Sequence, residues 1–287
     1  MSETSASLPA GGGGVLRPSP RLPALFVGHG SPMNAIGDNE FRRSWQALGA
    51  EFGRRWPRPQ LILCISAHWL TRGWRLTAMA QPKTIHDFGG FPQELFDQQY
   101  PAPGWPAAAQ EISSLLGVAG AGLDAGEWGL DHGAWSVLKP MFPAADIPVI
   151  QLSMDYSRPA GEHFALARRL QALRERGVLV VGSGNIVHNL RTMRPDATGD
   201  QAYDWAVEFD GAIAQRIARG ELAALADFQQ LGQPAALSQP SHEHFLPLLY
   251  AAGAADPSEP VRFFNERFQA LSISMRSVIW GDDAQPA

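Results

Sequence analysis

The sequence contains one cysteine, Cys64, among 287 residues. A single thiol excludes an intrachain disulfide framework and a zinc site built from several thiolates. Cys64 lies inside the apolar run Leu61–Ile65, which predicts a small buried core residue. This sparse use of cysteine fits a reducing compartment, so we expect a cytoplasmic protein.

Charged residues are also few, at 18% of the chain, and the formal net charge is −5. No basic stripe is present to neutralise phosphates, so no nucleic-acid partner is expected. The short arginine clusters Arg168-Arg169 and Arg174-Arg176 fall on a predicted helix and are interpreted as a solvated face. No run approaches the roughly 20 apolar residues of a membrane helix, so no membrane association is expected.

Three catalytic motifs are absent from the sequence. These are the His-Glu-x-x-His helix of one zinc hydrolase class, the Gly-x-Ser-x-Gly elbow of serine hydrolases and the Gly-x-Gly-x-x-Gly dinucleotide loop. Residues 1–20 lack the basic start and the apolar segment of a secretory signal, and are rich in Ser, Gly and Pro. We expect residues 1–20 to form a disordered tail and residues 21–287 to form a single domain.

Apolar runs typical of buried strands alternate with segments of helical periodicity. The predicted strands are Ala24–Val27, Leu61–Ile65, Leu76–Met79, Pro148–Met154, Val178–Val181 and Ser272–Trp280. The predicted helices are Phe41–Phe52, Trp105–Leu116, Asp131–Met141, Ala160–Arg176, Tyr203–Arg219, Glu221–Phe228 and His244–Ala252. This alternation predicts an α/β fold, a three-layer α/β/α sandwich around a mostly parallel mixed sheet.

Three of the predicted strands are followed by a histidine: His29, His68 and His188. We expect the strands before His29 and His68 to be adjacent in the centre of the sheet. Ligands of such sheets gather beyond the carboxyl ends of the strands, so these imidazoles can converge on one metal ion. The small residues Gly182–Asn185, which precede His188, are expected to let the backbone approach the site closely.

The remaining histidines have less certain roles. In Ser241-His242-Glu243-His244 we expect one of the three metal-binding side chains to reach the ion, because neighbours point in different directions. Asp131 can orient the ring of His132 by a hydrogen bond.

His86 lies in an aromatic loop with Phe88 and can contact a substrate, whereas His163 is interpreted as a surface residue. Imidazoles with an optional carboxylate suit catalytic Zn²⁺ or non-haem Fe(II), and spacing alone does not choose between them.

Six motifs extend this histidine pattern over nearly the whole chain, from about Pro23 to the C-terminal strand. They are Gly28-His29-Gly30-Ser31-Pro32-Met33, Ser66-Ala67-His68-Trp69, His86-Asp87-Phe88-Gly89-Gly90-Phe91-Pro92, Asp131-His132-Gly133, Gly184-Asn185-Ile186-Val187-His188-Asn189-Leu190 and Glu243-His244-Phe245-Leu246-Pro247. Together they resemble the 4,5-DOPA dioxygenase extradiol group of the class III extradiol ring-cleavage dioxygenases.

The resemblance implies an oxidoreductase that opens the ring of a catechol, DOPA-like or otherwise, with O₂. It implies one divalent metal per chain, Fe(II) for activity and often zinc in purified protein. By resemblance His29, His68 and His244 are metal ligands, and His188 is a ligand or the acid–base residue. His132 is a second acid–base candidate, a role that suits a neutral imidazole.

The substrate pocket is expected to include Ser31, His86 and Phe88, and Arg191 can bind an anionic substituent or form a surface salt bridge. Two alternatives remain at this point: a zinc hydrolase that uses the same histidines with a metal-bound water, and a non-catalytic metal-binding protein. His242 and Glu243 compete with His244 as the third ligand. The sequence leaves the oligomeric state open.

Overall fold

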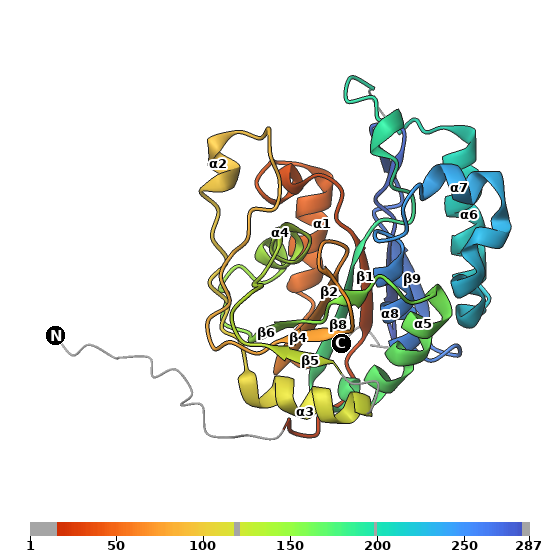
Figure 1. The fold of residues 1–287 in the computed structure, drawn as a ribbon. Helices are drawn as coiled ribbons and strands as arrows, with labels where there is room; N and C mark the ends of the chain where they lie inside the picture. The colour runs from red at the N-terminus through yellow and green to blue at the C-terminus, as the bar shows by residue number, and fades with distance from the viewer. Residues whose placement is uncertain (1–15, 118–120, 198–199, 283–287) are drawn as a thin grey trace.

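A six-stranded sheet lies at the centre of the protein. The computed structural model describes residues 16–117, 121–197 and 200–282, and Figure 1 shows helices on both faces of this sheet. The strand order is β6-β2-β8-β1-β12-β9. The strands are β1 (Ala24–Gly28), β2 (Leu61–Ser66), β6 (Val149–Gln151), β8 (Val178–Gly184), β9 (Val261–Phe264) and β12 (Ser277–Trp280).

Four neighbouring strands, β6, β2, β8 and β1, run parallel, and β12 is antiparallel to both β1 and β9. The predicted mostly parallel mixed sheet is therefore confirmed. Three short two-stranded sheets lie outside it: β3 (Leu70–Thr71) with β7 (Met154–Asp155), β4 (Arg75–Thr77) with β5 (Gly122–Asp124), and β10 (Phe268–Gln269) with β11 (Ile273–Ser274).

The helices form the two outer layers. Those of α type are α1 (Glu40–Gly49), α2 (Gln93–Phe96), α3 (Pro106–Leu116), α4 (His132–Met141), α5 (Ala160–Ala167), α6 (Asp204–Ala218), α7 (Gln233–Ser238) and α8 (Leu246–Ala254). The 3₁₀ segments are η1 (Pro32–Ala35), η3 (Arg168–Arg176), η4 (Leu190–Thr192) and η5 (Leu222–Leu231). Helices α1 and α4 share one apolar core, and α3, α5, α6 and α8 share the other.

The central strands are apolar throughout because both of their faces are covered. In β1, Leu25 and Val27 pack with α1 and α4, whereas Ala24 and Phe26 pack into the core that contains α5 and α8. Successive side chains of a strand point to opposite faces, so a strand between two helical layers must be apolar at every position. This is why the runs were readable in the sequence.

The strands before His29 and His68 are not adjacent, contrary to the prediction. Strand β8 lies between them, with Gly28 paired to Gly184 and Ser66 paired to Ser183. Because β1, β8 and β2 are parallel, their carboxyl ends still meet at one edge of the sheet. Strand β8 therefore lies at the centre of this edge, between β2 and β1.

Several other predicted elements differ from the observed ones. The run Leu76–Met79 contributes to β4, which lies in a two-stranded sheet, and the predicted last strand is divided into β11 and β12. The predicted helix Ala160–Arg176 is α5 followed by the 3₁₀ segment η3.

The expected disordered tail, residues 1–20, lies mostly outside the described residues. Leu16, however, is buried, and its carbonyl accepts a hydrogen bond from Arg176 at 2.8 Å. The backbone amide of Ser19 donates to the carbonyl of Glu175 at 2.8 Å. Residues 16–20 therefore pack against the domain rather than belonging to a tail.

Two predicted surface residues are buried. Arg174 is fully buried and pairs with Glu259 at 2.8 Å, so the predicted solvated arginine face is wrong at this position. His163 is also fully buried, and its Nδ1 lies 2.8 Å from the hydroxyl of Tyr250. Both side chains lie under α8, where a polar group must find a partner inside the protein.

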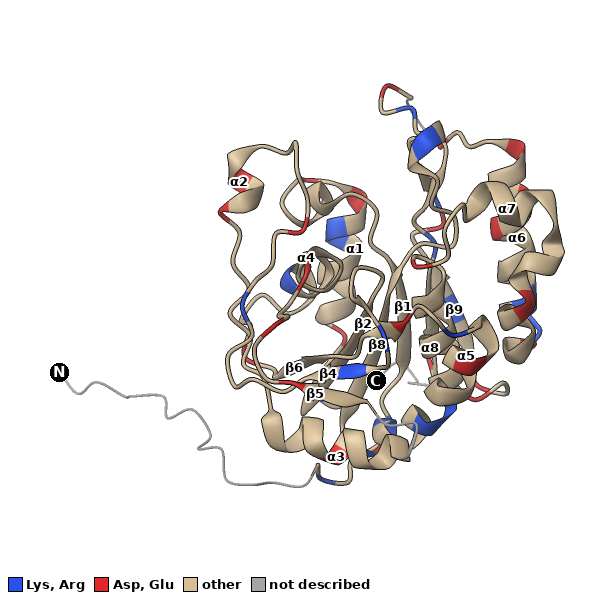
Figure 2. Ribbon diagram, in the orientation of Figure 1, with Lys and Arg blue, Asp and Glu red and all other residues tan. Residues whose placement is uncertain are grey.

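Charged side chains of both signs are distributed over the described elements (Figure 2). Within the described ranges, every helix is too short or too polar to cross a lipid bilayer.

Candidate metal and catalytic site

Three histidines meet at the carboxyl edge of the sheet. His29 follows β1, His68 follows β2 and His244 precedes α8. Their potential ligand atoms all lie within 4.8 Å of one another. The three ring centroids form a nearly equilateral triangle with sides of 5.2, 5.3 and 5.1 Å. This arrangement brings together three imidazoles that are far apart in the sequence.

Glycines in β8 allow the segment of His244 to reach this position. The backbone amide of Asn185 donates to the carbonyl of His244 at 2.8 Å. A Cβ on Gly184 would lie 2.1 Å from that same carbonyl oxygen, and a Cβ on Gly182 would lie 2.2 Å from the oxygen of Pro247. The predicted close backbone approach is confirmed, and the chain that approaches is the one that carries His244.

A serine fixes the proton of His29. The hydroxyl of Ser183 donates to the carbonyl of Gly133 at 2.5 Å, so its oxygen accepts from Nδ1–H of His29 at 3.0 Å. A neutral imidazole with its proton on Nδ1 carries its free lone pair on Nε2. Ser183 therefore leaves Nε2 of His29 available for a metal ion.

Carboxylates do the same for the other two histidines. Nδ1 of His68 lies 3.4 Å from Oδ2 of Asp87, and Nδ1 of His244 lies 3.3 Å from Oε1 of Glu243. An ionised carboxylate only accepts hydrogen bonds, so each contact favours the tautomer of the imidazole that carries its proton on Nδ1. Nε2 of His68 faces Nε2 of His29 at 3.3 Å. Such outer partners are typical of metal-binding histidines.

Burial keeps these imidazoles neutral. Desolvation and the neighbouring histidines lower the pKa of His29 and of His244 well below the usual value. Desolvation, followed by the charge of His132, lowers the pKa of His68 to about 4. Neutral nitrogen with a free lone pair is the form that binds a metal ion.

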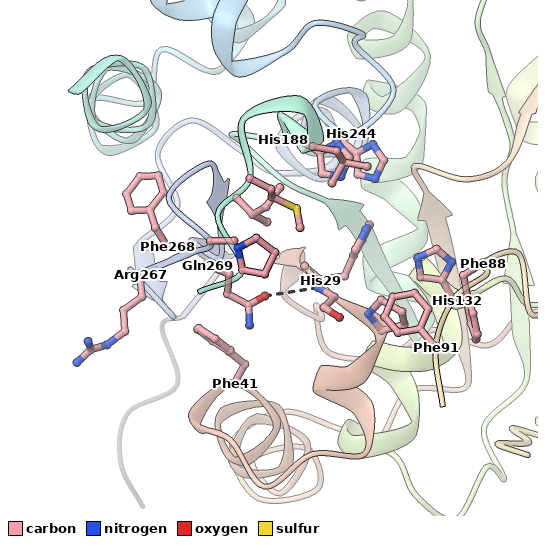
Figure 3. A pocket seen from close by; sticks show the side chains of 18 of the residues that line it. His29, Phe41, Phe88, Phe91, His132, His188, His244, Arg267, Phe268 and Gln269 are labelled. Atoms are coloured by element: carbon pink, nitrogen blue, oxygen red, sulfur yellow. Dashed lines mark hydrogen bonds between the residues drawn. The ribbon is translucent and has the colours of Figure 1, made fainter. Parts of the chain in front are cut away.

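His188 lies beside the three histidines, and its potential ligand atom lies within 4.8 Å of those of Glu243 and His244. Its ring stacks on that of His244, with centroids 3.4 Å apart and planes inclined by 6°. Figure 3 shows the two rings together at one side of the pocket. Burial lowers the pKa of His188 to about 4. His188 contributes a neutral imidazole to the pocket wall next to the cluster.

His132 lies on the other side of the cluster, with its ring centroid 3.9 Å from that of His68. The predicted orientation of its ring by Asp131 is wrong. Asp131 instead caps α4 by accepting from the amide of Ala134 and also accepts from Ser66 at 2.6 Å. The carboxylate next to Nδ1 of His132 is that of Asp87, at 3.0 Å.

Within residues 241–244, only His244 belongs to the group formed with His29 and His68. His242 faces the side-chain amide of Gln229, at 3.0 Å from Nε2. Glu243 lies against the outer nitrogen of His244 and accepts from the hydroxyl of Ser241 at 2.9 Å. Glu243 and His244 also form a second possible metal group, with His188, so His244 belongs to both groups.

The histidines line a cavity of about 800 Å³, a size typical of small-molecule sites. Ser31 and Phe88 line it, as expected. His86 does not line it: its Nε2–H donates to the carbonyl of Gln98 at 2.9 Å, and its ring packs behind Phe88. Its role as a substrate-binding residue stays a prediction.

Arg191 is exposed and does not line the cavity, so it is not placed to bind a substituent there. Arg267 lines it instead and pairs with Glu40 at 3.1 Å and with Asp200 at 3.6 Å. Figure 3 shows Arg267 on the opposite side of the pocket from His132 and His188. The cavity thus has a histidine end and a charged end.

Sequence reasoning missed two contributors to the site. Asp87 follows His86 in the sequence, but only His86 is predicted there as a site residue. Gln269, on β10, lines the cavity and exchanges two hydrogen bonds of 3.1 Å with the side chain of Asn34. Nothing in the sequence around Gln269 signals this, because the pair joins residues 235 positions apart.

The chain matches a family model described as the catalytic LigB subunit of aromatic ring-opening dioxygenase, over residues 23–276. The chain belongs to the LigB family. Members of this family use a metal, and the histidine cluster is a site that can hold one.

Curated relatives of this LigB-family chain are named as extradiol dioxygenases. It is 49% identical over 267 residues to the 4,5-DOPA dioxygenase extradiol of Escherichia coli K12, covering 92% of this chain and 96% of that one. It is 37% identical over 261 residues to the enzyme of the same name from Beta vulgaris, covering 88% and 94%.

A crystal structure of an uncharacterized protein from Escherichia coli K12 matches with a TM-score of 0.78 and 43% identity, covering 91% of this chain and all of that one. Together these matches show an extradiol ring-cleaving dioxygenase, an oxidoreductase that incorporates O₂. They do not favour the zinc hydrolase alternative.

Proposed function

We propose that this LigB-family enzyme opens the ring of a DOPA-like catechol with O₂, using one divalent ion held by His29, His68 and His244. The observation that carries the proposal is the convergence of these three imidazoles, each with Nδ1 already engaged by Ser183, Asp87 or Glu243. Three open nitrogens at one point, on the wall of a cavity, form a metal site with room for a substrate.

The geometry of the cluster fits such an ion. Two imidazoles bound at about 2.0–2.1 Å in a tetrahedral site have nitrogens about 3.3 Å apart. Nε2 of His29 and Nε2 of His68 are 3.3 Å apart. Imidazole ligands accept both Fe(II) and Zn²⁺, and we propose Fe(II) for activity with zinc able to occupy the same site. When bound, the ion supplies Lewis-acid and redox chemistry at the diol.

We propose that His188 and His132 handle protons. Both line the cavity on either side of the cluster, and neither ring belongs to the group formed by His29, His68 and His244. A neutral imidazole at the pocket wall can take the proton of a catechol hydroxyl and return it to the ring-opened product. His188, stacked on His244, is the nearer neighbour of the third ligand.

The rest of the cavity suits a substituted catechol. Phe88 and Phe91 present aromatic edges beside His132, and Ser31 offers a hydroxyl. The charged end, formed by Arg267 and Glu40, can pair with the carboxylate and ammonium groups of a DOPA side chain. We further propose that residues 21–287 act as a single catalytic domain, which the family match over residues 23–276 supports.

The test is to load the protein anaerobically with Fe(II), add DOPA or 4-methylcatechol, and admit air. We expect O₂ uptake matched to the appearance of a yellow ring-opened product, and no uptake without metal. His29→Ala should abolish both metal binding and turnover. O₂-independent activity with Zn²⁺, or metal binding without any O₂ uptake across a series of catechols, would reject the proposal.

A further inference from the structure

The carboxylate of Asp87 contacts two histidines, His68 and His132. Oδ2 lies 3.4 Å from Nδ1 of His68, a proposed ligand. Oδ1 lies 3.0 Å from Nδ1 of His132, a proposed acid–base residue, and accepts the backbone amide of His132 at 2.9 Å. The side chain of Asp87 is 18% exposed, so water competes little for these contacts.

We infer that Asp87 is a positioning residue that holds His68 and His132 together through its two oxygens. The inference rests on the proposed metal site and adds a role for a residue outside it. Because an ionised carboxylate only accepts, its contact with Nδ1 of each ring favours the tautomer that carries the proton on Nδ1 and presents Nε2 as a lone pair. One side chain thus sets the tautomer of a ligand and of a proton acceptor at the same time.

The packing around the two rings is close. The two rings lie 3.9 Å apart between centroids and are tilted by 47°, too close for a second side chain to enter between them. A Cβ on Gly133 would lie 2.8 Å from Cδ2 of His68, so the ring of His68 is also closed off by the first turn of α4. The backbone bond from His132 fixes α4 to Asp87, and with it the relative place of both rings.

Asp87→Asn separates the two functions of the carboxylate. The amide keeps one oxygen, which can still accept from the amide and ring of His132, but its NH₂ group faces Nδ1 of His68. Two donors then oppose each other, and His68 relieves the conflict by moving its proton to Nε2. We expect binding of Zn²⁺ to weaken about 10- to 100-fold, the usual effect of removing an outer partner.

The experiment measures Zn²⁺ affinity of the full-length protein by competition with a chromophoric chelator, and reads the tautomer of His68 by ¹⁵N NMR of the metal-free protein. The matched control is Asp124→Asn. Asp124, the last residue of β5, is also an aspartate away from the histidines, and its carboxylate accepts from the backbone amides of Gly126, Glu127 and Trp128. We expect the control to keep Zn²⁺ affinity and His68 tautomer unchanged, even where it lowers the melting temperature.

A second measurement tests the link to His132. At saturating Fe(II), Asp87→Ala, which removes both oxygens, should lower kcat in the wild-type background but have little further effect in a His132→Ala background, because the two changes remove one shared element. The inference would be overturned if Asp87→Asn had the Zn²⁺ affinity and the His68 tautomer of the unmodified protein. Absence of Zn²⁺ binding by the unmodified protein would instead reject the proposed metal site itself.

Discussion

The imidazole rings of His188 and His244 lie parallel, with centroids 3.4 Å apart and planes inclined by only 6°. The lone pair of an imidazole nitrogen lies in the plane of its ring, so stacked rings direct their lone pairs side by side rather than toward one point. We therefore expect only one of the two to bind an ion held by His29 and His68. His244 has an outer partner, Glu243, so we expect His244 to be the ligand and His188 to serve in proton transfer.

Two substitutions test the different roles expected of His188 and His244. We expect His244→Ala to weaken Zn²⁺ binding by more than about 100-fold, because it removes a ligand. His188→Ala should keep affinity within a few fold while lowering kcat by about 10²- to 10⁴-fold, the range of a lost acid–base group. The measurement is chelator competition together with O₂ uptake at saturating Fe(II). Equal loss of metal in both variants would place His188 among the ligands.

Ser183 is predicted to matter through His29. Ser183→Ala removes the acceptor of Nδ1–H of His29 and leaves the carbonyl of Gly133 without this donor. We expect a loss of about 1–3 kcal/mol of unfolding free energy and about tenfold weaker Zn²⁺ binding.

Ser136→Ala is the control for Ser183→Ala, since Ser136 is similarly buried and its hydroxyl has no hydrogen-bond partner. It should change neither quantity by much. Urea denaturation and chelator competition give the two readouts, and a Ser183→Ala variant that behaves like the control would remove Ser183 from the metal site.

Gly184→Ala should displace the segment that carries His244. The new Cβ would lie 2.1 Å from the carbonyl oxygen of His244, a backbone atom that cannot move without shifting the ligand. Overpacking of this kind costs about 1–3 kcal/mol, and we expect weaker metal binding with it. Gly211→Ala, within α6 and with open space around its Cβ, should instead stabilise the protein by about 0.5–1 kcal/mol. Thermal unfolding and Zn²⁺ affinity compare the pair.

The metal-free protein should lose stability as the pH falls from about 6.5 to about 4. Burial lowers the pKa of His68 and of His188 to about 4 in the folded state, whereas the usual value is 6.5. Between these values the unfolded chain binds more protons, so unfolding becomes easier by an amount on the order of a few kcal/mol. Urea denaturation from pH 4 to 8 measures this, and stability should be nearly constant above pH 7 as far as these groups are concerned.

The control for the pH prediction is His188→Gln, which removes one of the two titrating groups without adding a charge. Its stability curve should fall less steeply below pH 6.5. A curve identical to that of the unmodified chain would show that His188 does not contribute to the pH dependence.

Arg267 is expected to affect substrate choice rather than chemistry. Arg267→Gln should raise KM for DOPA by about three- to tenfold, because a half-exposed ion pair contributes about 1 kcal/mol. The kinetic parameters for 4-methylcatechol, which carries no charged substituent, should stay nearly unchanged. An equal effect on both substrates would show that Arg267 supports the shape of the pocket instead.

The strand runs and their histidines were predictable from the sequence for a physical reason. A parallel strand between two helical layers has to be apolar on both faces, so Leu25–Val27 and Leu61–Ile65 are visible as continuous runs. The residue that ends such a run lies at the carboxyl edge of the sheet, which is why His29 and His68 could be assigned to one site. The family resemblance added His244 to this pair.

The partners of these histidines were decided only by tertiary structure. Ser183 reaches His29 across 154 positions of sequence, and Asp87 reaches His132 across 45, whereas the adjacent Asp131 turns away to cap a helix. Local sequence shows which side chains can donate or accept, but not which of them the packing of β8 and α4 brings within hydrogen-bond distance. The strand order, with β8 between β1 and β2, is of the same kind, because it depends on how distant segments pair.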